Sequence, residues 1–173
     1  MYHGWVGLSQ DVIELRYYDN IDSASEKLKD SSVQAYINLH GSFQGIVRVT
    51  GSEIANVISE LVKKSIDRCY FHRLSFKRDG EWDELLLVLC GDTVVASYGE
   101  VEGKEEVGVK SLEKIVKNIN EDKYTHGIIE MIEVPLKLVE NKLGVKVEAL
   151  AVKEKEEKEE VKEEKLVAEE KPP

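Results

Sequence analysis

Three residues near the middle of the chain, Cys69, His72 and Cys90, are of the types that bind metals or act as nucleophiles. Cys69 and His72 stand three positions apart in a strand-like segment, and that spacing places two side chains on opposite faces of a strand. Cys90 could lie beside Cys69 across a hairpin, but two ligands without a nearby histidine make a poor metal site. No general base is placed to activate a cysteine nucleophile. The sequence therefore predicts no catalytic, cofactor-binding or metal-binding residue, and a site assembled around these three stays the alternative.

The dipeptide Gly91-Asp92 is a second place where chemistry could occur, because it follows a long apolar run. A phosphate-binding loop needs a strand, a glycine-rich turn and then a helix whose amino terminus faces the anion. The segment 93–98 is instead rich in β-branched residues and has strand character. Two residues with glycine first, between two strands, are typical of a tight hairpin turn. We therefore expect a bend here and no bound nucleotide.

The charge balance argues against nucleic acid as a partner. The net charge is −10, and phosphate backbones are bound by clustered lysine and arginine. A local basic stretch at 72–78 is followed at once by four acidic residues, which is typical of a solvated hairpin end. The amino terminus lacks the pattern of a signal peptide, and no apolar run approaches the roughly 20 residues of a membrane span. These features predict a cytoplasmic protein that does not bind membranes.

The two cysteines are too few for a disulfide framework in a chain of 173 residues. In a reducing cytosol the expected state is two buried thiols. Lysine and glutamate are abundant while glutamine is rare, and this bias is typical of hyperthermophiles. The composition therefore favours an archaeal-like, hyperthermophilic source.

The composition changes sharply after Leu150. Residues 151–173 are rich in glutamate and lysine and offer little apolar surface, so they cannot offset the entropy cost of ordering. We expect one domain at 1–150 and a charged tail, disordered or transiently helical, at 151–173. The tail either keeps the protein soluble or docks onto a partner through the apolar residues 166–168.

The pattern of apolar residues in the body predicts an α+β fold with a mainly antiparallel sheet. The run Leu85–Leu89 is apolar on both faces, which indicates a central strand. Ser52 is the expected cap of the clearest amphipathic helix, and Asp22 or Ser23 caps an earlier one. The expected helices are 21–28, 52–62, 109–119 and one that starts at Pro135 and ends at Gly144, and the expected strands are 33–39, 45–50, 69–77, 84–90, 93–98 and 127–134.

Residues 52–134 resemble the PATAN-type domain, named for the amino-terminal region of PatA-like proteins, and an uncharacterised archaeal family. The residues that carry the resemblance are Gly91 at the turn, Val94 and Ala96 in the next strand, Gly108 and Leu112 at a helix start, and Gly127-Ile128-Ile129 in the closing strand. Asp67-Arg68 and Ser111 depart from the family pattern. The resemblance implies a non-catalytic interaction module associated with small GTPases or signalling partners.

The expected element order is also similar to roadblock and longin folds, from about residue 21 to residue 120. Both likenesses imply a GTPase-associated platform rather than an enzyme. We therefore predict a protein-interaction adaptor. Its surface would be a sheet edge at 45–49 or 127–134, because unpaired strand edges invite a protein partner or a homodimer. The alternative surface is the 109–119 helix, if its apolar stripe is wider than the sheet can cover. The alternative is an enzyme or small-ligand binder that uses Cys69, His72 and Cys90.

Overall fold

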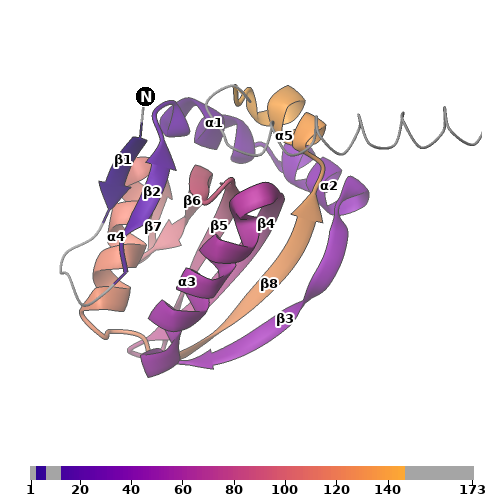
Figure 1. Ribbon diagram of the computed structural model, residues 1–173. Helices are drawn as coiled ribbons and strands as arrows, with labels where there is room; N and C mark the ends of the chain where they lie inside the picture. Colours follow the sequence, from indigo (N-terminus) through magenta and orange to yellow (C-terminus); the bar gives the residue numbers. More distant parts are fainter. Residues whose placement is uncertain (1–2, 7–12, 147–173) are drawn as a thin grey trace, which may run out of the picture.

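The computed structural model describes residues 3–6 and 13–146, and within them eight strands form one sheet (Figure 1). The strands are β1 (His3–Val6), β2 (Leu15–Tyr18), β3 (Ser42–Thr50), β4 (Cys69–Arg78), β5 (Glu81–Cys90), β6 (Thr93–Val101), β7 (Lys104–Val107) and β8 (His126–Val134). Their order is β1-β2-β6-β5-β4-β8-β3, with β7 paired to β6. The pairs are antiparallel except β2 with β6, which are parallel. The predicted α+β class with a mainly antiparallel sheet is confirmed.

Helices cover both faces of this sheet. They are α1 (Ile21–Leu28), α2 (Ser31–His40), α3 (Ile54–Lys64), α4 (Val109–Asn120) and α5 (Leu136–Leu143). The buried apolar residues of α3 and α4 belong to one apolar cluster with one face of the strands, and those of α2 and α5 belong to a second cluster on the other face. Ala24 and Leu28 of α1 also belong to the second cluster, while Ile21 at its start belongs to the first. The arrangement is therefore helix, sheet, helix, as Figure 1 shows.

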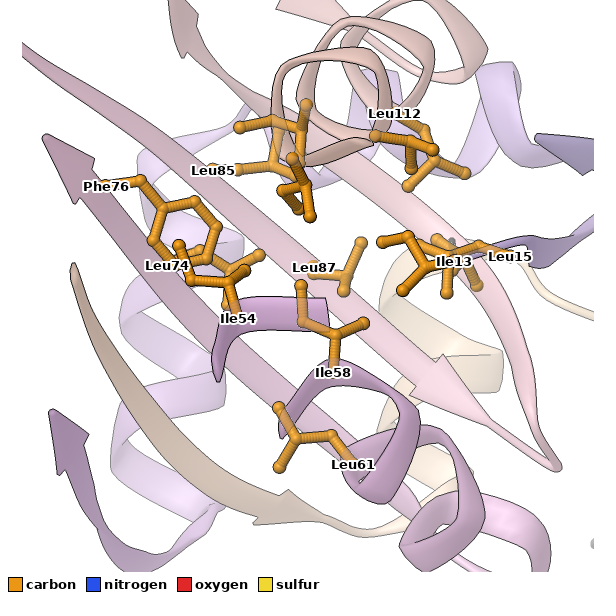
Figure 2. Close-up of a cluster of buried hydrophobic side chains, with 14 of the residues drawn as sticks. Ile13, Leu15, Ile54, Ile58, Leu61, Leu74, Phe76, Leu85, Leu87 and Leu112 are labelled. Carbon is orange, nitrogen blue, oxygen red and sulfur yellow. The ribbon is translucent and has the colours of Figure 1, made fainter. Parts of the chain in front are cut away.

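β5 is the central strand that its apolar run predicts. Its odd-numbered leucines point to the α3/α4 face, where Leu85 and Leu87 lie among Ile54 and Ile58 of α3 (Figure 2). Val88 points to the other face and is fully buried in the second cluster. Because burial of each such side chain contributes about 1.5–3 kcal/mol, this strand is a major source of stability.

The Gly91-Asp92 bend is confirmed. It joins β5 to β6 directly, and both residues have positive φ, 55° for Gly91 and 64° for Asp92. Two successive positive φ angles are the signature of a tight turn that matches the twist of a hairpin. Asp79-Gly80 and Glu102-Gly103 form the same kind of two-residue turn at the other ends of these strands.

The segment 33–39 is helical, so the predicted strand there is wrong. The carboxylate of Asp30 accepts a hydrogen bond from the backbone N–H of Ser32 at 2.9 Å and caps the amino terminus of α2. The helix then places Ile37 on its buried side. The cap decides the structure because it satisfies a backbone donor that only a helix start leaves unpaired.

Two predicted caps are also wrong. Thr50 and Glu53, rather than Ser52, form the capping box before α3. Asp22 does not cap its own helix α1, because its carboxylate accepts from the backbone N–H of Val109 at 2.9 Å, at the start of α4. The Asp22 carboxylate therefore links α1 to the start of α4. The expectations for the tail at 151–173 lie outside the described residues.

Candidate functional site

Cys69 and Cys90 form a disulfide, so the expectation of two buried thiols is wrong. The first residue of β4 and the last residue of β5 are directly opposite in the antiparallel register, with their Cα atoms 4.2 Å apart. Both are nearly fully buried. The bond leaves neither sulfur as a thiolate ligand or nucleophile.

His72 lies on the opposite face of the sheet from the disulfide. Its register partners are Leu87 on β5 and Met131 on β8, which face α3. The ring is 1% exposed, and neither nitrogen has a hydrogen-bond partner among the described residues. Burial lowers the pKa of His72 to about 4, and the backbone of Glu130 opposes this shift.

The three candidate residues therefore do not converge: the disulfide joins Cys69 to Cys90 on one face of the sheet, and His72 lies on the other. The pocket beside the disulfide, about 250 Å³, is lined by His40, Arg68 and Glu133 among others. Its main charges pair with each other, since Arg68 Nη1 lies 2.9 Å from Glu133 Oε1. Within residues 3–6 and 13–146 no three His, Cys, Asp or Glu side chains are grouped so that they could hold a metal ion.

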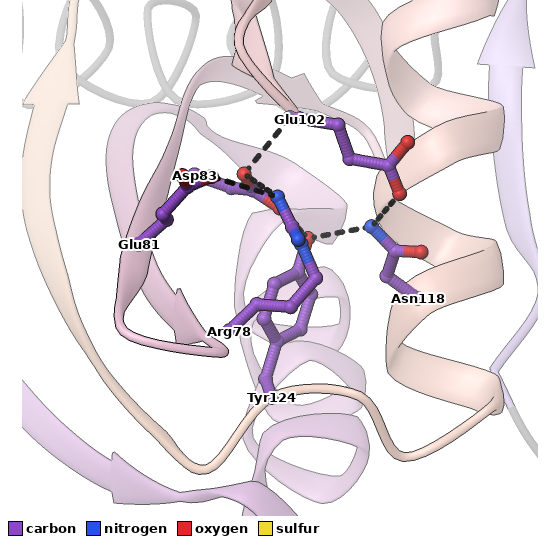
Figure 3. A network of polar contacts seen from close by, with 6 residues as sticks. All are labelled: Arg78, Glu81, Asp83, Glu102, Asn118 and Tyr124. Carbon is purple, nitrogen blue, oxygen red and sulfur yellow. Dashed lines mark hydrogen bonds and ion pairs between the residues drawn. The ribbon is translucent and has the colours of Figure 1, made fainter.

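The most connected polar cluster surrounds Asp83, a β5 residue that is 1% exposed (Figure 3). Its Oδ2 accepts from the Tyr124 hydroxyl at 2.7 Å and from Arg78 Nε at 3.2 Å. Its Oδ1 accepts from Arg78 Nη2 at 3.2 Å and from the backbone N–H of Glu102 at 2.9 Å. Asn118 of α4 donates to the Tyr124 oxygen at 3.1 Å. We call these five residues the Asp83 network.

The Asp83 network is closed and offers no position for a substrate. Burial alone would raise the pKa of Asp83, but the hydrogen bonds from Arg78, Glu102 and Tyr124 outweigh it and hold the pKa below its usual value. Burial raises the pKa of Tyr124, so its hydroxyl stays protonated and donates. The network ties two hairpin turns, α4 and the loop after α4 into one unit, which is a structural role.

The open region of the molecule is the β3 edge. β3 pairs with β8, and no other strand in the described part of the chain pairs with its outer side (Figure 1). The predicted edge at 45–49 is therefore confirmed. The predicted edge at 127–134 is wrong, because β8 returns to lie between β3 and β4 and is paired on both sides. Along its nine residues β3 carries one charged side chain, Arg48.

Exposed apolar side chains gather beside this edge. Phe43 and Ile46 of β3 align with Ile132 and Glu130 of β8, on the face that α1, α2 and α5 partly cover. We call the exposed apolar residues on α2, β3 and β8 the β3 patch. Its members and their exposed fractions are Tyr36 (39%), Leu39 (77%), Phe43 (60%), Ile46 (58%) and Ile128 (37%). Large exposed apolar side chains beside an unpaired strand edge are typical of interaction sites.

Sequence reasoning found the β3 edge and missed the Asp83 network. The acidic residues after 72–78 predict a solvated hairpin end, but one of them, Asp83, continues the odd-numbered series of Leu85 and Leu87 that points into the α3/α4 face. This alternation was the signal that could have revealed a buried carboxylate.

Comparisons of the chain with protein-family models, with curated proteins and with solved structures found no match. The resemblance to the PATAN-type domain therefore stays a prediction. The roadblock-type order expected a strand at 33–39, where the structure has α2. In the described part of the chain, no helix has both the length and the apolar character needed to cross a bilayer.

Proposed function

We propose that this protein is a non-catalytic interaction module that binds another protein chain along β3. The observation that carries the proposal is a nine-residue edge strand with one charge and two exposed apolar side chains, Phe43 and Ile46. Native proteins protect exposed edges with short strands, prolines or several charges. β3 is long, has no proline and carries one charge, and its one bulge, between Phe43 and Gly45, leaves 45–50 in regular register with β8. An added strand can therefore form backbone hydrogen bonds with this regular part and cover the β3 patch at the same time.

Two further features favour binding over catalysis. The disulfide occupies both cysteines, and the buried His72 ring has no access to a partner group. The largest polar cluster uses its donors and acceptors internally. The family resemblance adds a class of partner, because PATAN-type modules are associated with small GTPases and signalling proteins. We propose such proteins as the partners to test first.

Capture from native extract, with three baits, tests the proposal. The baits are the wild-type chain, Ile46→Lys in the edge, and Ile66→Lys as a control, since Ile66 has nearly the same exposure (56% against 58%) but lies outside the β3 patch. We expect a partner that wild type and Ile66→Lys retain and Ile46→Lys loses. A set of captured proteins that is unaffected by Ile46→Lys would contradict an interaction along β3, and turnover of nucleotides or phosphoesters would contradict the non-catalytic role.

A further inference from the structure

We propose that one occupant of the β3 edge is a second copy of this chain, paired antiparallel with β3 about a two-fold axis at Val47. This inference rests on the proposed function, because it names the partner of the same surface. The dimer would contain one continuous sheet, in which the two β8 strands flank the two β3 strands.

The faces of the strand restrict where the axis can lie. Opposite residues in a continuous antiparallel sheet must lie on the same face, so position 46 can face an even-numbered position of the second copy. An axis at Val47 places Ile46 of each copy opposite Arg48 of the other. An axis at Arg48 would instead place two arginines directly opposite each other, which is destabilising.

Charge complementarity supports the axis at Val47. Glu130 of β8 is the register neighbour of Ile46. In the dimer, β3 lies between Glu130 and Arg48 of the second copy, so their backbones are two strand spacings apart, about 9.6 Å. The long side chains of Glu130 and Arg48 can together span this distance. Among the described residues Arg48 forms no ion pair in the single chain, whereas Glu130 is paired with Arg73 at 3.7 Å. In the dimer, Arg48 of the second copy would therefore lie near Glu130, which already forms an ion pair with Arg73.

The apolar residues of the β3 patch fit the same arrangement. With the axis at Val47, the two Ile46 side chains lie diagonally across the β3 pair on one face, within contact distance for large side chains. α2 leads directly into β3 through Gly41, so Tyr36 and Leu39 lie on the segment nearest this edge. An isologous interface uses each exposed group twice, once from each copy.

The rest of the sheet explains why association stops at two copies. The other end of the sheet is bounded by β1 and β7, which have four residues each, and β7 reads Lys-Glu-Glu-Val. Short and charged edge strands resist pairing. With one competent edge per chain, a two-fold contact closes and forms a dimer rather than a fibre.

The mass of the purified full-length protein tests the inference. Sedimentation equilibrium over a concentration series is expected to show wild type and Ile66→Lys at twice the mass of the 19.6 kDa chain. In Ile46→Lys, each new lysine faces Arg48 of the other copy, so we expect the dissociation constant to rise about tenfold or more. Circular dichroism and a thermal melt check that this exposed substitution leaves the fold intact.

A single cysteine at the axis gives an independent test. In Val47→Cys the two new thiols would be directly opposite, so mild oxidation is expected to give a covalent dimer. The wild-type cysteines are already joined within each chain, which makes wild type the blank. Glu105→Cys, at the β7 edge, is the matched control and should stay uncross-linked.

A wild-type chain that is monomeric at every concentration, or a dimer unaffected by Ile46→Lys, would overturn the inference. So would a dimer that Val47→Cys fails to cross-link, because the axis would then lie elsewhere. These failures differ from a failure of the proposed function: a monomer that still captures a different protein in an Ile46-dependent manner refutes the second copy and supports the interaction module.

Discussion

The Asp83 network and the β3 edge lie in the same sheet, but they differ in how their polar groups are hydrogen-bonded. Asp83 is buried, and its carboxylate accepts four hydrogen bonds that come from two hairpin turns and the loop after α4. The outer backbone groups of β3 have no strand partner in the described part of the chain, and Ile46 beside them is 58% exposed. Full internal satisfaction stabilises one region, while the other keeps its hydrogen-bonding capacity for another molecule.

This difference predicts that stability and association can be changed separately. Substitutions in the closed region should lower the free energy of unfolding and leave binding along β3 unchanged at temperatures where the protein is folded. Substitutions on the edge should do the reverse.

The largest effect is expected from Asp83→Ala. It removes the acceptor of four hydrogen bonds and leaves Arg78, whose side chain is 13% exposed, without its main partner. Breaking such a buried pair costs about 3–5 kcal/mol. Urea unfolding measures the loss, and Tyr124→Phe, which removes one hydroxyl, should cost about 1–2 kcal/mol. If Asp83→Ala were as stable as wild type, the network would have no structural role.

Removal of the disulfide should have the next largest effect. Cys69 and Cys90 are separated by 21 positions, and a crosslink that closes a loop of this size stabilises a fold by about 3 kcal/mol. We expect Cys69→Ala/Cys90→Ala to lower the melting temperature clearly, and reduction of the unfolded wild type to lower its refolded stability similarly. A melting temperature that is equal with and without the bond would contradict this prediction.

Acid should destabilise the protein through His72. Its pKa is about 4 in the folded state and near 6.5 when exposed, so between these values the unfolded state binds more protons. Stability is therefore complete above about pH 6.5 and falls as the pH drops to about 4, by up to about 3 kcal/mol. His72→Phe should flatten the urea-unfolding profile in this window. An unchanged slope would show that other groups govern it.

Gly91→Val should cost about 1 kcal/mol or more, because a β-branched residue is strained at the φ of 55° that the turn requires. The thermal melt measures this loss. A variant with unchanged stability and a lost affinity for nucleotides would contradict the turn interpretation.

The smallest effect on unfolding is expected on the edge itself. Ile46→Lys changes an exposed side chain, so its free energy of unfolding, measured at a concentration where the protein is monomeric, should stay within about 0.5 kcal/mol of wild type. A large loss of stability would mean that Ile46 belongs to the core, and the patch would then be no docking surface.

Local signals predicted much of this fold. The amphipathic helices α3 and α4, the central strand β5 and the turn at Gly91-Asp92 follow from apolar periodicity and turn chemistry. The segment 33–39 misled the prediction because Val33, Ala35, Ile37 and Leu39 alternate as in a strand. The hydrogen bond from the Ser32 backbone to the Asp30 carboxylate favours the helix, and the alternation of apolar residues gives no sign of this cap.

Long-range features were beyond local reasoning. The pattern of β8 predicts a strand but does not say that it inserts between β3 and β4. The partners of Asp83 come from positions 78, 102 and 124, which are brought together by three separate turns. The disulfide likewise depends on the β4–β5 register, which aligns Cys69 with Cys90. Strand order and register are set by the whole sheet, so a single segment cannot specify them.

Hydrogen exchange along β3 tests the central claim most directly. Amide exchange would be followed by mass spectrometry in the wild-type protein and in Ile46→Lys, both at a concentration where the wild type is associated. If β3 is an interaction surface, its amides exchange more slowly in the wild type than in Ile46→Lys, while β4 and β5 exchange equally in both. Equal exchange of β3 in the two proteins, both alone and in the presence of a captured partner, would contradict the account.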